Sequence, residues 1–249
     1  MHVAIVTVGD ELLAGETANT NATWLAGEIA GRGGSVQRIV TVPDGETIIA
    51  DYVSRWRERF DAVIVTGGLG DTPDDVTMNA VADALDRDMV VYDSVQDQLV
   101  EKGRDLRAER PELFDEHDLE LNPAVSARLP EGARPIVTDA GWAPGCVVEN
   151  VYVFAGFPEE MKAAFGRVAE EFDGAAVSRS VYTPVPEGAL NGLLTGVRER
   201  FDVTVGSYPR KGSEPGRVNV SGTDADELAD AVAWIEGEIE TLEPPAETE

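Results

Sequence analysis

Residues 62–77 read AVIVTGGLGDTPDDVT, a short apolar run that leads directly into Gly67, Gly68 and Gly70 and then into a helical pattern. A continuous apolar run suits a strand that is buried on both faces of a parallel sheet. Glycines after such a strand let an anion approach backbone N–H groups, and ligands of open α/β sheets bind at this edge. The stretch therefore predicts a parallel sheet with a candidate anion-binding loop.

The same stretch also fits the start of a helix. Thr72 suits an N-cap, Pro73 suits the first helical position, and Asp75 falls where a capping box places its acidic residue. Asp74 and Asp75 offset the helix dipole in this interpretation. No Gly-Lys-Ser/Thr follows and no third glycine completes G-x-G-x-x-G, so neither familiar phosphate loop is present. Spacing alone leaves the ligand loop and the capped helix as compatible alternatives.

Strand-like and helix-like segments alternate on both sides of this stretch. Strands are predicted at 2–8, 36–42, 62–66, 134–138 and 151–154, and helices at 21–30, 46–59, 74–85 and 158–172. This alternation predicts a parallel sheet with crossover helices, and the charged helical segment 94–128 is interpreted as a peripheral excursion. The later strands are predicted at 176–184, 203–208 and 217–221, with helices at 190–200 and 225–239. We therefore predict a domain over 1–172, a small α+β subdomain over 173–241 and a disordered tail over 242–249.

Composition excludes several functions. The chain carries 47 acidic and 20 basic side chains, a net charge of −27 that repels nucleic acid and anionic membranes. This balance is typical of salt-loving organisms and suggests a haloarchaeal source. Cys146 is the single cysteine, so a disulfide framework is excluded, and we expect this residue to be a packed small hydrophobe. No apolar run reaches the roughly 18–20 residues of a membrane span and no signal-peptide pattern is present, so a cytoplasmic protein is expected.

Carboxylates follow three of the predicted parallel strands. Asp10 and Glu11 come after the first strand, Asp44 after the second and Asp75 after the third. His2 and His117 have no metal-ligand spacing, so metal or acid–base chemistry is expected from carboxylates. By composition alone, Asp44 is more often a turn former than a ligand. Because Glu11, Asp44 and Asp75 follow strands of one parallel sheet, they are expected to converge and form a hard oxygen site for Mg²⁺ or a similar ion.

Two further loops, 141–146 and 155–161, combine Gly/Pro turns with an aromatic residue that can stack on a flat ring. Gly/Pro pairs mark ordinary turns more often than binding sites, so these loops alone indicate little. They add Gly145, Gly156 and Pro158 to the candidate ligand-binding residues.

Together these motifs resemble the N-terminal domain of competence/damage-inducible protein A (CinA), which is similar to the molybdopterin-binding fold of MoaB, MogA and MoeA. The resemblance rests on residues 9–13, 66–70, 72–77, 143–145 and 156–161, which occur in the family's order. It implies a three-layer α/β/α domain with a mostly parallel, MoaB/MogA-like sheet, followed by the small α+β subdomain. Asp71 and Cys146 stand where the family often has proline and phenylalanine. The sequence ends without the amidase domain of full-length CinA proteins, so no deamidation is expected.

The resemblance also implies a pocket for a phosphate-bearing pterin or nucleotide. Members of the CinA group are associated with ADP-ribose pyrophosphatase activity that needs a divalent metal (Mg²⁺, Mn²⁺ or Co²⁺), sometimes with K⁺. We expect catalytic roles for Asp75, Asp74 and Asp10, of which Asp74 or Asp10 orients water. By motif position, the metal is assigned to Glu11, Asp44 and Asp75, and the ligand to Gly9, Gly67, Gly68, Leu69, Gly70, Thr72, Gly145, Gly156 and Pro158.

Three functions stay open at this point. The first is metal-dependent cleavage of ADP-ribose or a related dinucleotide into two monophosphates. The second is binding or transfer of molybdopterin or its adenylylated form without hydrolysis, and the third is a pocket kept for structure or for a regulatory ligand. The resemblance also implies a homo-oligomer, either a dimer as in CinA proteins or a trimer as in MogA proteins.

Overall fold

The computed structural model of the protein describes residues 1–70, 72–116, 119–210 and 215–244. It divides into two compact units, the first formed by Met1–Ile29 with Ser35–Phe172 and the second by Ala30–Gly34 with Asp173–Glu249. No helix within the described ranges is long and apolar enough to cross a lipid bilayer. Residues 245–249 of the predicted tail lie outside the described ranges, whereas the Leu242 N–H donates to the Tyr182 carbonyl at 2.8 Å.

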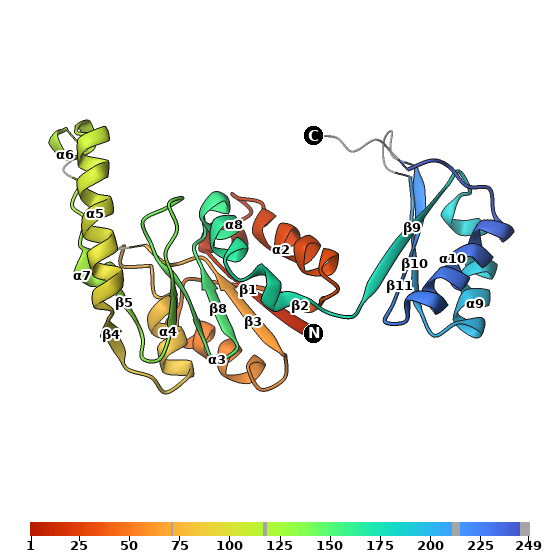
Figure 1. The fold of residues 1–249 in the computed structure, drawn as a ribbon, viewed down its shortest axis with the longest axis horizontal. Helices are drawn as coiled ribbons and strands as arrows, with labels where there is room; N and C mark the ends of the chain where they lie inside the picture. Colours follow the sequence, from red (N-terminus) through yellow and green to blue (C-terminus); the bar gives the residue numbers. More distant parts are fainter. Residues whose placement is uncertain (71, 117–118, 211–214, 245–249) are drawn as a thin grey trace. The chain divides into compact units, whose positions relative to one another are not determined.

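The first unit is built on a six-stranded sheet (Figure 1). Strands β2, β1, β3 and β8 lie side by side in that order and pair parallel. Strand β7 then pairs antiparallel with β8, and β6 pairs antiparallel with β7. In side-by-side order the strands are β2 (Ser35–Val42), β1 (His2–Val8), β3 (Ala62–Thr66), β8 (Val151–Phe154), β7 (Gly145–Val148) and β6 (Arg134–Ile136). The prediction of a mostly parallel α/β sheet is confirmed.

Helices cover both faces of this sheet because its central strands are apolar on both sides. In β3, Val63 and Val65 belong to one buried cluster, and Ala62 and Ile64 belong to the other. Helices α3 (Glu46–Trp56) and α4 (Thr77–Ala84) pack on the first cluster. The second cluster is covered by α2 (Thr20–Gly31), α8 (Pro158–Gly166) and the 3-10 turn η1 (Ala169–Phe172). The expected three layers are therefore present, as Figure 1 shows.

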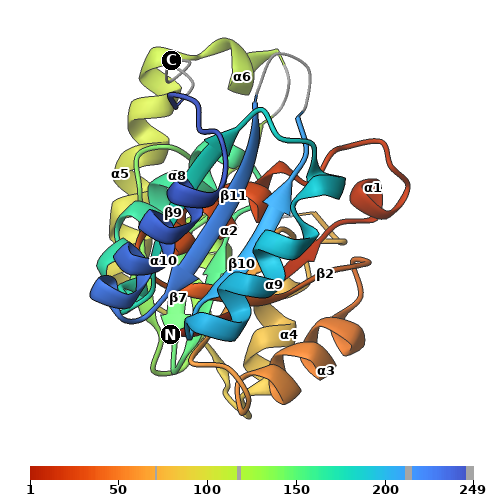
Figure 2. The same cartoon turned by 90° about the vertical axis from the view of Figure 1, so that its right-hand side faces the viewer.

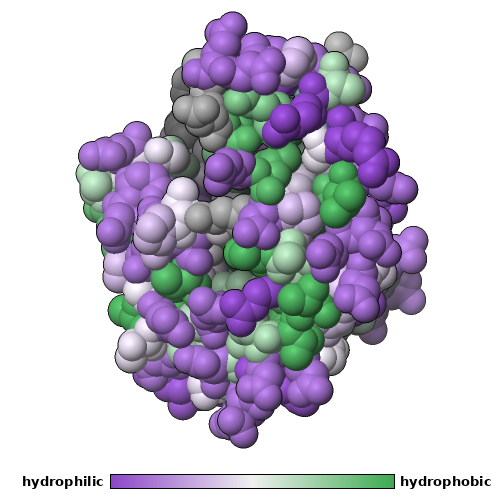
Figure 3. Space-filling view, turned by 90° about the vertical axis from the view of Figure 1, so that its left-hand side faces the viewer, coloured by the Kyte–Doolittle hydropathy of each residue, from purple (hydrophilic) through white to green (hydrophobic). Residues whose placement is uncertain are grey.

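The charged segment forms a peripheral subassembly of short elements. It consists of β4 (Met89–Val91), α5 (Asp93–Glu109), α6 (Glu112–Asp115), α7 (Pro123–Ser126) and β5 (Arg128–Pro130), with β4 and β5 paired antiparallel. Helix α5 buries Val95 and Leu99 and exposes its charged residues except Lys102, which is half-buried. Figure 3 views the first unit from the side that carries α5, where apolar side chains form separate patches in a hydrophilic surface.

Two segments close to the glycine loop differ from the sequence-based expectation. Helix α4 begins at Thr77 with Val76 as its N-cap, so the predicted cap at Thr72 is wrong. The reason is that the Asp75 N–H donates to the Thr72 carbonyl at 3.0 Å, which closes a separate turn before the helix. Gly145 and Cys146 belong to strand β7 instead of a loop. A Cβ atom at Gly145 would lie 2.6 Å from the Val153 carbonyl oxygen, so this glycine allows β7 to pair closely with β8.

The second unit packs two helices on one face of a three-stranded antiparallel sheet (Figure 2). Its elements are β9 (Val177–Thr183), the 3-10 turn η2 (Glu187–Ala189), α9 (Asn191–Arg200), β10 (Thr204–Tyr208), β11 (Gly216–Gly222) and α10 (Ala225–Glu238). Asp224 caps α10 by accepting from the Asp226 N–H at 2.9 Å. The predicted small C-terminal α+β arrangement is confirmed.

The second unit includes Ala30–Gly34, which lie far from its other residues in the sequence. The Gly174 N–H donates to the Arg32 carbonyl at 2.8 Å, and the Ala176 N–H donates to the Gly33 carbonyl at 3.1 Å. A Cβ atom at Gly33 would lie 2.4 Å from the Gly174 carbonyl oxygen. Glycine is therefore required where these two backbone segments meet.

The single thiol provides a test of the core. Cys146 is fully buried beside Met78, with the two sulfur atoms 3.6 Å apart, and burial raises its pKa to about 12. Because the thiolate is the reactive species, we expect no reaction with iodoacetamide at pH 8 in the folded protein and one equivalent after unfolding. Mass spectrometry of native and denatured samples checks this. Rapid labelling of the native protein would contradict the buried placement.

Candidate functional site

The glycine loop occupies the carboxyl end of β3. Gly67 has a φ of 110° and Gly68 a φ of 65°, in the region that favours glycine. A Cβ atom at Gly67 would lie 2.2 Å from the Val8 carbonyl oxygen, so the loop crosses the end of β1 at a distance that only glycine permits. The Gly67 N–H donates to the Phe154 carbonyl at 3.1 Å, which also ties the loop to β8.

A buried hydroxyl lies under this loop. Thr77 is fully buried, and its Oγ1 has no hydrogen-bond partner among the described residues. A Cβ atom at Gly68 would lie 2.5 Å from this Oγ1, and the Thr77 N–H donates to the Gly68 carbonyl at 3.2 Å. An unpaired buried hydroxyl costs about 1–3 kcal/mol, so its position beside a candidate ligand loop marks it as a candidate binding group.

Polar side chains line the neighbouring strand ends. The Asn19 side-chain amide donates to Thr7 Oγ1 at 2.9 Å and to Thr41 Oγ1 at 3.2 Å, and its Oδ1 accepts from the Ala22 N–H at 3.1 Å. The Asn21 amide donates to the Gly156 carbonyl at 2.7 Å, while its buried Oδ1 has no partner among the described residues. Neither asparagine is among the residues predicted from the sequence, although Asn19, Thr20 and Asn21 form a polar run at the start of α2.

Two small hollows lie on either side of the glycine loop. The first, here the Asn21 hollow, has a volume of about 80 Å³ and is lined by Thr7, Val8, Glu11, Leu12, Thr17, Ala18, Asn19, Thr20, Asn21, Thr66, Gly156 and Pro158. The second, here the Asp75 hollow, has a volume of about 130 Å³ and is lined by Gly68, Leu69, Gly70, Asp75, Met78, Asn79, Met89, Val125, Ser126, Arg128 and Pro144. Ligand pockets usually measure about 300–1,000 Å³, so neither hollow alone encloses a nucleotide.

The predicted carboxylates are distributed around the loop. The Asp44 carboxylate accepts from the Asp10 N–H at 2.8 Å, at the start of the short helix α1 (Asp10–Leu13). The Glu11 carboxylate folds over Gly9, where a Cβ atom would lie 2.5 Å from its Oε1. Glu11 lines the Asn21 hollow, whereas Asp75 lines the Asp75 hollow. The predicted metal set of Glu11, Asp44 and Asp75 is not brought together, and the described residues contain no group of three carboxylate, histidine or cysteine side chains placed to hold a metal ion.

The remaining predicted residues differ in how close they lie to the two hollows. The Asp75 carboxylate accepts from the Thr72 N–H at 3.0 Å and from the Thr72 hydroxyl. A hydrogen bond from Thr72 also lowers the pKa of Asp74, which is therefore an anion near neutral pH. Gly156 packs against Gly67, since a Cβ atom on it would lie 3.3 Å from the Gly67 Cα. Gly145 lines neither of the two hollows.

A lysine holds the segment that leads to Pro144 on the wall of the Asp75 hollow. Lys102 on α5 donates through Nζ to the carbonyls of Thr138, at 2.7 Å, and Gly141. Burial lowers the pKa of Lys102, and the charges of Asp139 and Glu160 act in the opposite direction. Burial also raises the pKa of Glu160. The contacts of Lys102 therefore hold the segment before Pro144 in place, and they do so through a charged group that is partly shielded from water.

The fold and the candidate site define an α/β protein with a mostly parallel sheet and a candidate small-molecule site at the carboxyl ends of its parallel strands. The chain belongs to the family described as the probable molybdopterin binding domain, which matches residues 4–173. Residues 175–243 match a second family, described as the middle domain of FAD synthase.

Archaeal proteins are similar over nearly the whole length. A protein of Archaeoglobus fulgidus is 34% identical over 238 residues, covering 95% of this chain and 97% of its own. A protein of Pyrococcus furiosus is 33% identical over 243 residues, covering 94% of this chain and 96% of its own. A solved structure titled as the protein CinA with unknown function from Thermoplasma acidophilum matches with a TM-score of 0.56 and 26% identity, covering 70% of this chain and 99% of that one. The chain therefore has a CinA-like molybdopterin-binding domain.

Substitution of Gly67 tests the close crossing of the loop and β1. We expect Gly67→Ala to lower the free energy of unfolding by more than about 3 kcal/mol, because the new methyl group overlaps the Val8 carbonyl. Gly15→Ala is the matched control, because Gly15 also has a positive φ, 74°, but has no atom within 4 Å of its Cβ position. Its expected cost is about 1–2 kcal/mol. Denaturant titration at constant KCl compares the two, and equal losses would contradict the steric argument.

Proposed function

We propose that the first unit binds a ligand with a diphosphate and a flat ring, and that it hydrolyses the diphosphate of ADP-ribose or a related dinucleotide. The observation that carries the proposal is the glycine loop itself, held at the carboxyl ends of β1, β3 and β8 with Asp75 on its rim. Backbone N–H groups in such a loop favour phosphate oxygens. The two hollows beside the loop accommodate the two ends of an extended ligand.

A divalent ion suits this site only if the ligand completes its coordination. Mg²⁺ is commonly held by one or two carboxylates together with substrate phosphates and water, so a cage of three protein carboxylates is not required. We assign the Asp75 carboxylate to this ion, because Asp75 lines the hollow beside the glycine loop. When bound, such an ion polarises a phosphoryl group and lowers the pKa of water.

The chain's own residues orient the ligand and the attacking water. The glycine loop fixes one phosphoryl group, and the Thr72 contacts hold the Asp75 carboxylate in place. Asp74 is an anion beside the same turn and is our candidate to orient the water. Water attack on one phosphorus breaks the bridging P–O bond and yields AMP and ribose 5-phosphate from ADP-ribose.

Binding of molybdopterin or its adenylylated form without hydrolysis is the second candidate. The family description favours it, and so does the separation of Glu11, Asp44 and Asp75 around the loop. The two candidates share the phosphate-binding loop and differ in whether the diphosphate is cleaved. A bound pterin released on denaturation, together with folded protein that forms no AMP, supports this second function.

An activity assay separates the candidates. In concentrated KCl with Mg²⁺, Mn²⁺ or Co²⁺, we expect the protein to form AMP from ADP-ribose only when the metal is present. Chromatography measures the AMP. Asp75→Asn removes the charge but keeps an acceptor for Thr72, and should lower the rate at least about 100-fold.

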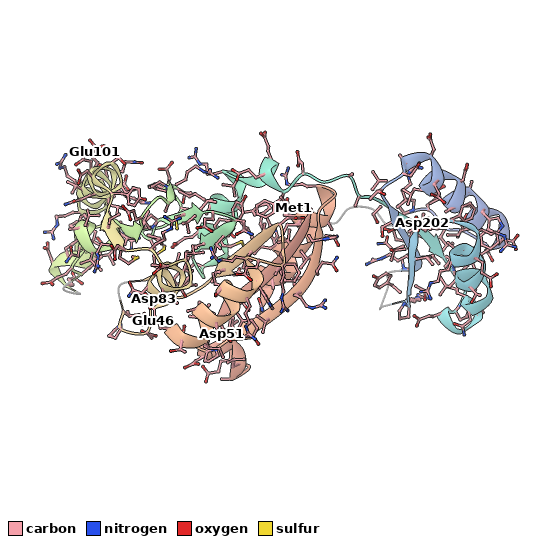
Figure 4. All side chains as sticks on the ribbon, turned by 90° about the horizontal axis from the view of Figure 1, so that it is seen from below. Met1, Glu46, Asp51, Asp83, Glu101 and Asp202 are labelled. Carbon is pink, nitrogen blue, oxygen red and sulfur yellow. The ribbon has the colours of Figure 1, made fainter. Side chains whose placement is uncertain are left out.

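Asp83→Asn is the matched control, because Asp83 is exposed on α4, as Glu46 and Asp51 are on α3 (Figure 4). This control should retain the wild-type rate. An unchanged rate in Asp75→Asn would contradict the proposed site, and the absence of AMP from folded wild-type protein would contradict hydrolysis of this substrate.

A further inference from the structure

Arg128 is the basic residue that lines the Asp75 hollow, opposite in charge to Asp75. The glycine motif gave no indication of it, because Arg128 lies more than fifty positions further along the sequence. It enters the site because β5 pairs with β4, with Arg128 opposite Val91. The predicted phosphate loop therefore has a guanidinium group in the same hollow.

The strand fixes the side of β5 from which Arg128 projects. Its two neighbours, Ala127 and Leu129, are fully buried, whereas Arg128 is exposed. Because successive side chains of a strand point to opposite faces, burial of both neighbours directs Arg128 away from the core and onto the hollow. The Trp142 Nε1–H donates to Ser126 Oγ at 2.8 Å, which braces the chain just before β5.

Arg128 forms no ion pair within the part of the chain that the structure describes. The ion pairs formed among the described residues, such as Arg57 with Glu149 and Arg134 with Glu171, do not include Arg128. Asp75 lines the same hollow but hydrogen-bonds to Thr72. In a chain of net charge −27, an anionic ligand needs local positive charge to enter.

We propose that Arg128 and the glycine loop form a two-point diphosphate subsite, in which the loop binds one phosphoryl group and the Arg128 guanidinium binds the next. The planar guanidinium donates two parallel hydrogen bonds to phosphate oxygens, which an ammonium group cannot reproduce. The apolar wall of Met78, Met89 and Val125 then faces the part of the ligand beyond the diphosphate. The substrate class selected is a diphosphate ester, in preference to a monophosphate. This inference rests on the proposed function, since it assumes that the loop binds phosphate.

Direct binding tests the subsite without turnover. Isothermal titration with inorganic pyrophosphate and with inorganic phosphate, at fixed KCl, gives the preference of the wild-type protein for the diphosphate. We expect at least a tenfold preference in the wild type and a loss of 10-fold to 100-fold in pyrophosphate affinity in Arg128→Ala, with little change for phosphate. Arg128→Lys should fall between the two, because it keeps the charge but not the planar fork.

Arg104→Ala is the matched control, because Arg104 is an exposed arginine on α5 outside both hollows. It removes the same charge from the same unit and should bind pyrophosphate like the wild type. Thermal unfolding of each variant confirms that the fold is retained.

The outcomes separate this inference from the function on which it rests. Wild-type binding of pyrophosphate with unchanged affinity in Arg128→Ala would overturn the role of Arg128 and leave the glycine loop as the phosphate site. Equal losses in Arg128→Ala and Arg104→Ala would also overturn it, because they would reflect net charge alone. No binding of pyrophosphate or ADP-ribose by the folded wild type would overturn both proposals.

Discussion

The site depends on how closely the chain after β3 passes the end of β1. At Gly67 the gap is so small that a Cβ atom would lie 2.2 Å from the Val8 carbonyl oxygen, and the Gly67 N–H is bonded to β8. This contact joins three parallel strands at their carboxyl ends. Thr66 before the crossing lines one hollow, and Gly68 after it lines the other. One steric constraint therefore sets the position of the loop and of both cavities.

The negative charge of the chain affects the same region. A net charge of −27 keeps the surface hydrated but opposes the approach of a diphosphate. Concentrated salt shortens the range of this repulsion to a few ångströms. It weakens contacts between groups inside a hollow much less. In the proposed subsite, Arg128 beside the backbone N–H groups of the loop supplies the local positive charge that offsets this repulsion.

Local patterns predicted most of the fold, and non-local contacts account for the rest. The buried run 62–66 indicated a central strand, and the strands and helices of the second unit fall within a few residues of their predicted ranges. The cap at Thr72 was wrong because Asp75 closes its own turn with that residue. Strand β7 and the place of Arg128 follow from pairing with β8 and β4, which no local spacing encodes. Glu11 and Asp75 line different hollows and Asp44 lines neither, a separation that the order of the strands in the sequence did not reveal.

The second unit is discontinuous in sequence, since Ala30–Gly34 form part of it. Arg32 and Gly33 provide carbonyl acceptors for the backbone of Gly174 and Ala176. A truncation after Phe172 would leave these acceptors on the remaining fragment. The removed residues would then lack the backbone segment to which Gly174 and Ala176 donate. Genetic dissection of the two units therefore calls for two excisions and a short linker between Ile29 and Ser35. Because these five residues lie within the first 35 of the chain, a series of deletions from one end cannot separate the two units cleanly.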